Sequence, residues 1–326
     1  MTPGRLPGGN VRRVKAGAAG EGQRLDNFLL RTLAGVPKSR VYRLLRRGEV
    51  RVNGKRKRPE YRLAAQDEVR LPPVRPEPAA GGAPRRPPDA LLAAVRDAVI
   101  HEDERVLVLN KPPGLAVHGG SGLAFGAIEV LRALRPDEPL ELAHRLDRDT
   151  SGCLLVARSR PALVMLHALL REGRVQKHYA TLLAGRWSLG RKIIDAPVLT
   201  RQRQGGERVV RVHAGGKLAV SEFSPRERFG DLATLMDVAI RTGRTHQIRV
   251  HAAFAGHPVA GDEKYGDRAA NEALAELGLR RMFLHAESAA FAWPDTGAAF
   301  RATAPLPADL AALLVTLRGL TARNRR

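Results

Sequence analysis

A Pro-, Gly- and Ala-rich stretch constrains the fold of this chain more than any other feature. Residues 72–89 have the sequence PPVRPEPAAGGAPRRPPD. Such a composition cannot bury enough apolar surface to fold, so we predict a stiff, extended linker over residues 73–90. The linker separates a small domain, residues 21–72, from a large one, residues 91–326. Two domains also suit a length of 326 residues, since a domain averages roughly 150 residues.

The positive charge is concentrated in front of this linker. Residues 1–90 contain 21 Lys and Arg against 8 Asp and Glu, a net charge of +13 out of +22 for the whole chain. Residues 1–20 are basic, lack acids and are rich in Gly, so we predict a disordered basic arm there. A charge of this size favours a polyanionic partner such as nucleic acid.

Features that the sequence lacks exclude several classes of protein. The single cysteine, Cys153, excludes an internal disulfide and a Cys-rich zinc site, and it favours a reducing, cytoplasmic compartment. No run of about 18 uninterrupted apolar residues is present, so we expect no membrane span.

We expect neither a cofactor nor a metal ion. GGSGLAFG lacks the glycine spacing of a dinucleotide-binding loop, and GGKLAV lacks the Ser or Thr that follows Lys in a P-loop. His246, His251 and His257 invite a metal-site interpretation. Their spacings of five and six residues match no usual zinc pattern, and no Cys is nearby.

The first domain carries two basic features. Apolar residues recur at helical spacing over residues 25–29 and 41–45, which predicts two short amphipathic helices. A turn at Asn53-Gly54 predicts a hairpin. The predicted RNA-binding cations are Arg40, Arg43 and Arg47 on the second helix and Lys55, Arg56, Lys57 and Arg58 after the turn. Charge runs are usually plain solvated surface, but so many cations with few acids between them favour RNA or DNA binding by a small α/β domain.

The second domain mixes strands and helices without regular alternation. Apolar runs over residues 105–109 and 152–159 predict strands. Residues 161–173 predict a helix, with a proline in the first turn and a glycine at the end. Further strand-like runs are KHYATLLAG, ATLMDVAI, HQIRVHAA and SAAFAW. This irregular order predicts the α+β class, with a mixed, mostly antiparallel sheet and flanking helices.

A pair of aspartates lies among arginines in ELAHRLDRDTSG. If this stretch is extended, Arg145 and Asp147 point to one face, whereas His144 and Leu146 point to the other. Asp149 would then lie ~7 Å from Asp147, a spacing that allows an inverting glycosidase pair. Asp149 also begins DTSG, a run of turn and capping residues, which favours a structural role and leaves Asp147 as the reactive acid.

Two other segments carry candidate site residues. In RTGRTHQIRVHAAFAGHPVAGDEKYGD, Gly243 breaks the chain, and a predicted strand after it places Arg249 on one face and Ile248 on the other. In VQKHYATLLAG, Lys177 and Tyr179 occupy alternate positions of a strand, where a tyrosine is usually part of the core.

Together these segments resemble the consecutive motifs of the ribosomal large-subunit pseudouridine synthases. They occur in the order of that family and span most of residues 105–287, and the combination of HRLDRDTSG with RTGRTHQIRVH is highly specific. The motifs are LNKPPGLAVHGGSGLAFG, AHRLDRDTSGCLLVA, LHALLREGRVQKHYA, RTGRTHQIRVHAAFAGHPVAGDEKYGD and FLHAE. The first domain is similar to the small RNA-binding domain of a small-subunit ribosomal protein, which precedes many such synthases.

The resemblance implies that specific uridines of 23S ribosomal RNA are isomerised to pseudouridine by bond cleavage, base rotation and re-attachment through carbon. Asp147 would be the catalytic aspartate, which either attacks the anomeric carbon or removes a neighbouring sugar proton. Arg249 would face Asp147 and favour its charged form. Tyr179 would stack on uracil above Ile248, and Arg145 would enter the RNA stack while the base is flipped out.

The implied partner is large-subunit ribosomal RNA or its assembly precursor, bound by a monomer. Two alternatives stay open from the residues alone. One is an RNA-binding assembly factor without catalysis. The other is a nucleoside or glycoside hydrolase that uses both Asp147 and Asp149.

Overall fold

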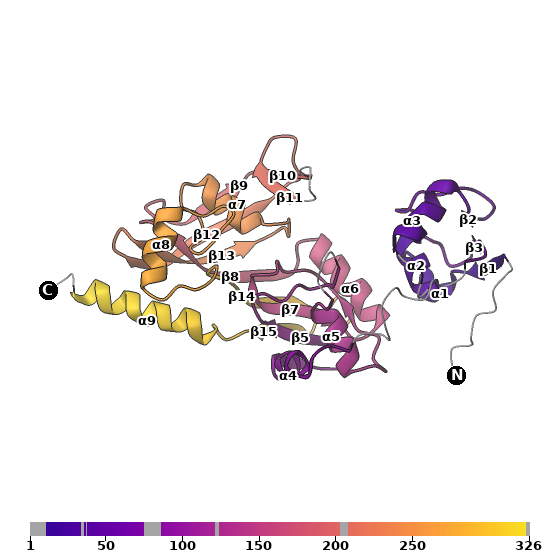
Figure 1. Ribbon diagram of the computed structural model, residues 1–326, viewed down its shortest axis with the longest axis horizontal. Helices are drawn as coiled ribbons and strands as arrows, with labels where there is room; N and C mark the ends of the chain where they lie inside the picture. The colour runs from indigo at the N-terminus through magenta and orange to yellow at the C-terminus, as the bar shows by residue number, and fades with distance from the viewer. Residues whose placement is uncertain are drawn as a thin grey trace. The chain divides into compact units, whose positions relative to one another are not determined.

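The computed structural model divides the chain into two compact units, Met1–Arg85 and Arg86–Arg326, which Figure 1 shows as ribbons. The described residues are 11–33, 36, 38–74, 86–120, 124–202 and 208–323. Most of the predicted linker over residues 73–90 lies outside them. The end of that prediction is wrong, because helix α4 (Asp89–Asp97) already begins there and places Leu92 and Val95 in the core of the second unit.

The first unit is a three-stranded antiparallel sheet with helices packed on it. Its strand order is β1 (Arg12–Lys15), β3 (Glu68–Leu71) and β2 (Arg51–Val52). The helices are α1 (Gly17–Gly20), α2 (Leu25–Thr32) and α3 (Lys38–Arg47). Both predicted amphipathic helices are therefore confirmed. Leu25, Leu29 and Val41 are fully buried on their inner sides, against Val69 of the sheet.

The predicted disordered arm over residues 1–20 is wrong for residues 11–20. Strand β1 pairs with β3 along its whole length, and the Ala16 N–H donates to the Asp67 carbonyl over 2.9 Å. The strand is mostly basic, so its own composition does not indicate order. Its stability comes from a partner strand far along the chain. Residues 1–10 lie outside the described part.

The turn at Asn53-Gly54 is confirmed, and an antiparallel bridge between Val52 and Lys55 closes it, but within the described residues no second strand continues beyond Lys55. Both turn residues have a positive φ, 48° and 75°, and the Val52 N–H donates to the Lys55 carbonyl over 2.9 Å. The chain then leaves the sheet, and β2 pairs with β3 instead. Pro59 has no N–H to donate, which disfavours a ladder strand over the basic residues before it.

The second unit is built on one large sheet, which confirms the predicted mixed, mostly antiparallel architecture. Its strands lie in the order β4 (Val99–Glu102), β5 (Val106–Lys111), β7 (Ser151–Ala157), β14 (Leu284–Ala292), β8 (Gln176–Ala184), β13 (Ala233–Ile240), β12 (Val220–Phe229) and β9 (Lys192–Asp195). In addition, β6 (Glu141–Leu142) pairs with β7, and β15 (Ala299–Thr303) pairs with β14. Strands β10 (Val198–Gln202) and β11 (Arg208–Val212) form a separate pair. Strand β8 is central, and β14 runs parallel to β7.

Helices cover both faces of this sheet (Figure 1). They are α5 (Ala127–Leu134), α6 (Arg160–Arg171), α7 (Gln247–Phe254), α8 (Arg268–Glu276) and α9 (Ala308–Arg323). Helices α4, α5 and α7 share a core with the face that carries Tyr179 of β8. Helix α6, which confirms the helix predicted over residues 161–173, packs on the other face, and α8 and α9 share a core with Leu182 of β8. No described helix has the length and apolar character to cross a membrane.

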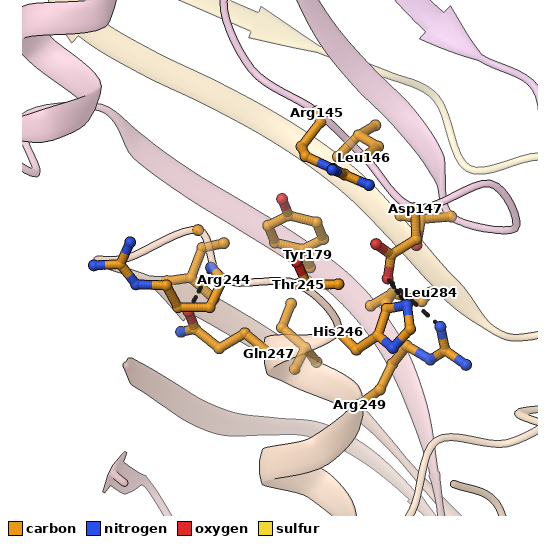
Figure 2. A pocket seen from close by; sticks show the side chains of 14 residues that line it. Arg145, Leu146, Asp147, Tyr179, Arg244, Thr245, His246, Gln247, Arg249 and Leu284 are labelled. Atoms are coloured by element: carbon orange, nitrogen blue, oxygen red, sulfur yellow. Dashed lines mark hydrogen bonds and ion pairs between the residues drawn. The ribbon is translucent and has the colours of Figure 1, made fainter. Parts of the chain in front are cut away.

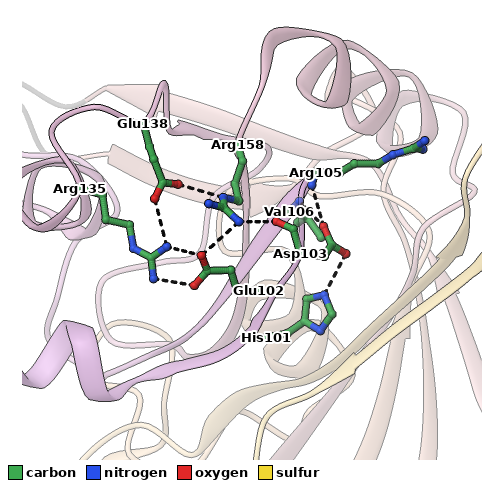
Figure 3. A network of polar contacts seen from close by, with 8 residues as sticks. All are labelled: His101, Glu102, Asp103, Arg105, Val106, Arg135, Glu138 and Arg158. Carbon is green, nitrogen blue, oxygen red and sulfur yellow. Dashed lines mark hydrogen bonds and ion pairs between the residues drawn. The ribbon is translucent and has the colours of Figure 1, made fainter.

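A charged network fastens strand β4 at the edge of the sheet (Figure 3). Glu102 of β4 accepts a hydrogen bond from Arg135 over 2.6 Å and forms an ion pair with Arg158. Arg158 also donates to Glu138 over 2.9 Å. These side chains are 23–35% exposed, so each pair contributes only roughly 0.2–1 kcal/mol. Together these interactions hold the edge strand β4 in place.

Candidate active site

One cavity of the second unit collects residues from four separate segments (Figure 2). Its walls are the loop before β7, strand β8, the connection from β13 into α7, and Leu284 of β14. All the residues predicted to form the pocket line it, namely Arg145, Asp147, Tyr179, Ile248 and Arg249. The fold therefore brings together side chains that are far apart in the sequence.

Asp147 lies in an unpaired stretch between β6 and β7. Arg145 and Asp147 face the cavity, as predicted. His144 is held elsewhere, because its Nε2 accepts the N–H of Leu155 over 3.0 Å. Leu146, predicted to share the face of His144, lines the cavity instead. The stretch belongs to no sheet ladder, so strict alternation of its side chains is not imposed.

A buried lysine, Lys111, donates hydrogen bonds to the backbone of this loop, and the sequence analysis did not predict it. Lys111 ends β5 with no exposed surface. Its Nζ donates to the carbonyls of Pro112, Leu115 and Arg148 over 2.9, 2.8 and 2.9 Å. Burial lowers the pKa of Lys111 to about 7. Because Arg148 directly follows Asp147, Lys111 holds the backbone that carries the carboxylate.

Arg249 is the cation that faces Asp147. Its Nη1 lies 3.5 Å from Asp147 Oδ2, while its Nε and Nη2 donate to the two oxygens of Asp262 over 2.7 and 2.8 Å. Burial opposes ionisation of Asp262, but the hydrogen bonds and charge of Arg249 leave the pKa of Asp262 below its ordinary value. Asp262 thus fixes the guanidinium and aims its remaining edge at Asp147.

The strand predicted for HQIRVHAA is wrong, because all but the first of these residues lie in helix α7. Ile248 and Ala252, four residues apart, both enter the core. Over so short a run, Ile248 and Val250 at alternate positions fit a strand and a helix equally well. The first turn of the helix still directs both Ile248 and Arg249 to the cavity.

His246 and Tyr265 complete the surroundings of Asp147. The sequence analysis considered His246 only as a metal ligand and missed Tyr265. His246 Nε2 lies 3.9 Å from Asp147 Oδ2, and its Nδ1 lies 2.8 Å from Tyr265 Oη. Tyr265 Oη accepts the N–H of Val210 over 3.2 Å, which leaves the phenol proton for Nδ1. Neutral His246 then carries its own proton on Nε2, toward Asp147.

His246 also has an unusual backbone. Its φ is 53°, in the left-handed region, and it immediately precedes α7. Non-glycine residues rarely adopt this conformation, and such strain is concentrated at functional sites. The strained backbone directs the imidazole into the cavity that Asp147 lines.

Tyr179 forms the aromatic wall of the cavity and lies between Arg244 and Asp147 in Figure 2. Burial, together with the charge of Asp147, raises the pKa of Tyr179 above its ordinary value. The phenol therefore keeps its proton near neutral pH and is unsuited to act as a base. Its ring offers a flat apolar face instead.

A larger cavity of about 700 Å³ adjoins the first one at Asp147. The two cavities share Arg145, Asp147, His246 and Arg249. The carboxylate therefore stands between a narrow recess with an aromatic wall and a wide polar cavity. Asp149 lines the wide cavity only, with its side chain 47% exposed and 3.0 Å from Arg148.

The other histidines considered as metal ligands are satisfied elsewhere. His251 is buried, with its Nδ1 3.0 Å from Ser221 Oγ and its Nε2 2.9 Å from the Ala196 carbonyl. His257 Nδ1 lies 3.0 Å from the Ala184 carbonyl. Within the described residues, no group of three or more His, Cys, Asp or Glu side chains is arranged to hold a metal ion.

The predicted RNA-binding cations are mostly exposed on the first unit. Helix α3 exposes Arg43 and Arg47, while Val41 and Leu45 on its inner side are buried. Arg40 is only partly exposed. After the turn, Lys55, Arg56 and Arg58 are exposed, and Lys57 is partly exposed over the Tyr61 ring.

The chain matches two family descriptions and close relatives. RNA pseudouridylate synthase matches residues 105–254, and S4 domain matches residues 23–69. The ribosomal large subunit pseudouridine synthase C of Pasteurella multocida is 52% identical over 304 residues, which cover 93% of each chain. The protein of the same name from Escherichia coli K12 is 52% identical over 318 residues, 95% of this chain and 97% of its own.

Solved structures agree with this similarity. Human RNA pseudouridylate synthase domain containing 4 is 26% identical, with a TM-score of 0.59 over 71% of this chain and 96% of its own. Human RNA pseudouridylate synthase domain containing 1 is also 26% identical, with a TM-score of 0.55 over 68% and 94%.

Proposed function

The chain belongs to the RNA pseudouridylate synthase family, and we propose that it isomerises specific uridines of large-subunit (23S) ribosomal RNA to pseudouridine. One observation carries the proposal at the level of chemistry. The Asp147 carboxylate lies 3.5 Å from a buried arginine, beside the aromatic wall of a recess.

Asp147 supplies the one reactive carboxylate that this reaction needs. The glycosidic bond breaks, the uracil turns and a bond to carbon forms, so no atom is gained or lost. The uracil leaves as a delocalised anion and stays in the recess, so no second acid has to protonate a departing group as in a hydrolase. Asp147 either attacks the anomeric carbon or removes a neighbouring sugar proton, and both routes use the charged carboxylate.

The neighbouring side chains take the roles that their positions allow. Tyr179 stacks on the uracil, and Ile248 supports the base from the other side of the recess. Arg145 is exposed at the rim, where its planar cation can occupy the gap that the flipped uridine leaves in the RNA stack. Flipping costs a few kcal/mol, so a group that fills the gap lowers the barrier to entry.

The first unit supplies affinity rather than selection. Its exposed cations contact phosphates, and such contacts weaken steeply as salt rises. The wide cavity beside Asp147 reads the shape of the RNA loop that carries the target. We further propose that the protein acts on ribosomal RNA or its assembly precursor as a cytoplasmic monomer, since one chain lines the whole Asp147 cavity.

Tritium release tests this function. Large-subunit RNA transcribed with uridine tritiated at carbon 5 loses its label when pseudouridine forms. The full-length protein should release tritium, Asp147→Asn should release none, and Asp149→Asn should keep its activity, because the Asp149 side chain is about half exposed and paired with Arg148.

Other outcomes would overturn the proposal. RNA binding without tritium release would identify an assembly factor without catalysis. Free uracil or a cleaved strand would identify a hydrolase, and loss of activity in Asp149→Asn would support the two-carboxylate alternative.

A further inference from the structure

Lys177 is a buried cation for which the second unit provides no acceptor. Its side chain is on β8, and the residue is only 9% exposed. Within the described part of the chain, no hydrogen bond or ion pair joins its Nζ to another residue. Buried charges are normally paired, as Lys111 is with its three carbonyls. Among the described residues, only Gln23 Oε1 is a fully covered side-chain polar atom without a hydrogen-bond partner, so Lys177 Nζ keeps access to solvent and to a ligand.

Lys177 does not itself line the Asp147 cavity, but it lies beside residues that do. It precedes Tyr179 by two residues on β8, so both side chains point to the same face of the sheet. A Cβ added at Gly243, which lines the cavity, would lie 3.9 Å from Lys177 Nζ. The next residue, Arg244, also lines the cavity. Figure 2 shows Arg244 and Asp147 on opposite sides of Tyr179.

No anion balances these two cations within the described residues. Burial, and then the charge of Arg244, lower the pKa of Lys177 to about 8. Arg244 uses its Nε to donate to the Leu218 carbonyl over 3.0 Å and forms no described ion pair. His144 is close enough for the charge of Lys177 to act on it, but burial lowers the pKa of His144 to about 4 and leaves it neutral.

The adjacent strands supply no charge either. In the sheet register, β13 places Ile240 opposite Lys177, and β14 places Ala289 there. The charge of the exposed Arg244 opposes the charged form of Lys177, and an anion bound near both would remove that cost.

We propose that Lys177 and Arg244 form a subsite for one backbone phosphate of the RNA, on the side of the cavity away from Asp147. The inference rests on the proposed function and adds a contact to it. A phosphate can accept hydrogen bonds from the ammonium and from the guanidinium at once. Held at this point, the phosphate would orient the sugar of the flipped uridine toward Asp147, which is a positioning role.

Methylphosphonate substitution tests the subsite. Once a modified uridine is mapped, a short RNA hairpin is made with a neutral methylphosphonate in place of either phosphate that flanks this uridine. With wild type, one of the two substitutions should lower kcat/KM by about 10- to 100-fold, the range for a lost charge-assisted hydrogen bond. Lys177→Met should show a similar loss on unmodified RNA and almost no further loss with that methylphosphonate.

The matched control is Arg241→Met. Arg241 is exposed and lies three residues before Arg244, but it does not line the cavity. This variant should keep the full sensitivity to the methylphosphonate. Circular dichroism of each variant checks the fold, and Lys177→Gln replaces Lys177→Met if the latter unfolds.

The pH profile of wild type gives a second readout that needs no variant. Phosphate binding requires charged Lys177, so kcat/KM on unmodified RNA should fall as pH rises above about 8, and the sensitive methylphosphonate should remove this decline. The subsite would be overturned if the losses in kcat/KM from Lys177→Met and from the methylphosphonate multiplied. It would also be overturned if kcat/KM still declined above about pH 8 with both methylphosphonate RNAs. Absence of tritium release by wild type would instead refute the proposed function itself.

Discussion

The arginines of the two units differ in how they are held. In the second unit, the Arg249 side chain is 10% exposed, and its guanidinium is fixed by both oxygens of Asp262. In the first unit, Arg43 and Arg47 are exposed on the outer side of α3. A fixed, buried cation can act on a single atom, whereas exposed cations attract a polyanion along its length. Under the proposed function, the same residue type would therefore serve turnover in one unit and affinity in the other.

Removing the fixed cation should have the largest effect. We expect Arg249→Ala to lower kcat by about 100- to 1,000-fold, as does the loss of a single preorganised electrostatic group in other enzymes. RNA affinity should stay within about threefold, since Arg249 is buried and the exposed cations are unchanged. Single-turnover kinetics and filter binding at constant salt measure the two quantities. An affinity loss as large as the turnover loss would remove the distinction between the two kinds of arginine.

The same variant requires a control for stability. It leaves Asp262 buried without its partner, which should destabilise the protein by about 3–5 kcal/mol. The double variant Arg249→Met/Asp262→Asn removes both charges and should recover most of the free energy of unfolding, but none of the turnover. Recovery of turnover with stability would mean that Arg249 acts only as a structural residue.

Removing exposed cations of the first unit should produce a smaller effect, on RNA affinity rather than on turnover. We expect Arg43→Ser/Arg47→Ser to raise KM and leave kcat unchanged. The slope of log affinity against log salt should become shallower by about 1 to 2, since each lost phosphate contact accounts for roughly 0.7–0.9 of that slope. Titrations at several salt concentrations measure this change. The control Arg268→Ser/Arg301→Ser removes two exposed arginines of the second unit, and an equal change in its slope would mean that the effect reflects net charge alone.

Sequence patterns predicted which residues form the site, but they did not predict the contacts that orient those residues. Asp147, Tyr179 and Arg249 stand in local motifs, so their shared cavity could be expected before the fold was known. Asp262, which orients Arg249, gave no signal, because only the turn after α7 brings it within 2.7 Å.

The errors in the fold have a similar physical origin. The alternation in HQIRV fits either a strand or the first turn of a helix, and packing of Ile248 and Ala252 into the core decides for the helix. The basic strand β1 has little order of its own and depends on pairing with β3. Interactions between distant segments decided both cases, and a local pattern does not contain them.

The smallest expected effect concerns the Tyr265 hydroxyl, which reaches Asp147 through His246. The Tyr265 ring, over which the Arg249 guanidinium lies 5.0 Å from the centroid, is kept in Tyr265→Phe. Tyr265→Phe removes the hydrogen bond to His246 Nδ1, formed over 2.8 Å, and no longer selects the tautomer with its proton on Nε2. We expect kcat to fall by about three- to tenfold with an unchanged KM, in keeping with one neutral hydrogen bond of roughly 0.5–1.5 kcal/mol.

A double-mutant cycle decides whether this path exists. If Tyr265 works through the imidazole, Tyr265→Phe should have no further effect on kcat in a His246→Asn background. Its effect on the free energy of unfolding should remain in both backgrounds, because the N–H of Val210 loses its acceptor in each. Additive losses in kcat would contradict the path and would mean that Tyr265 affects turnover independently of His246.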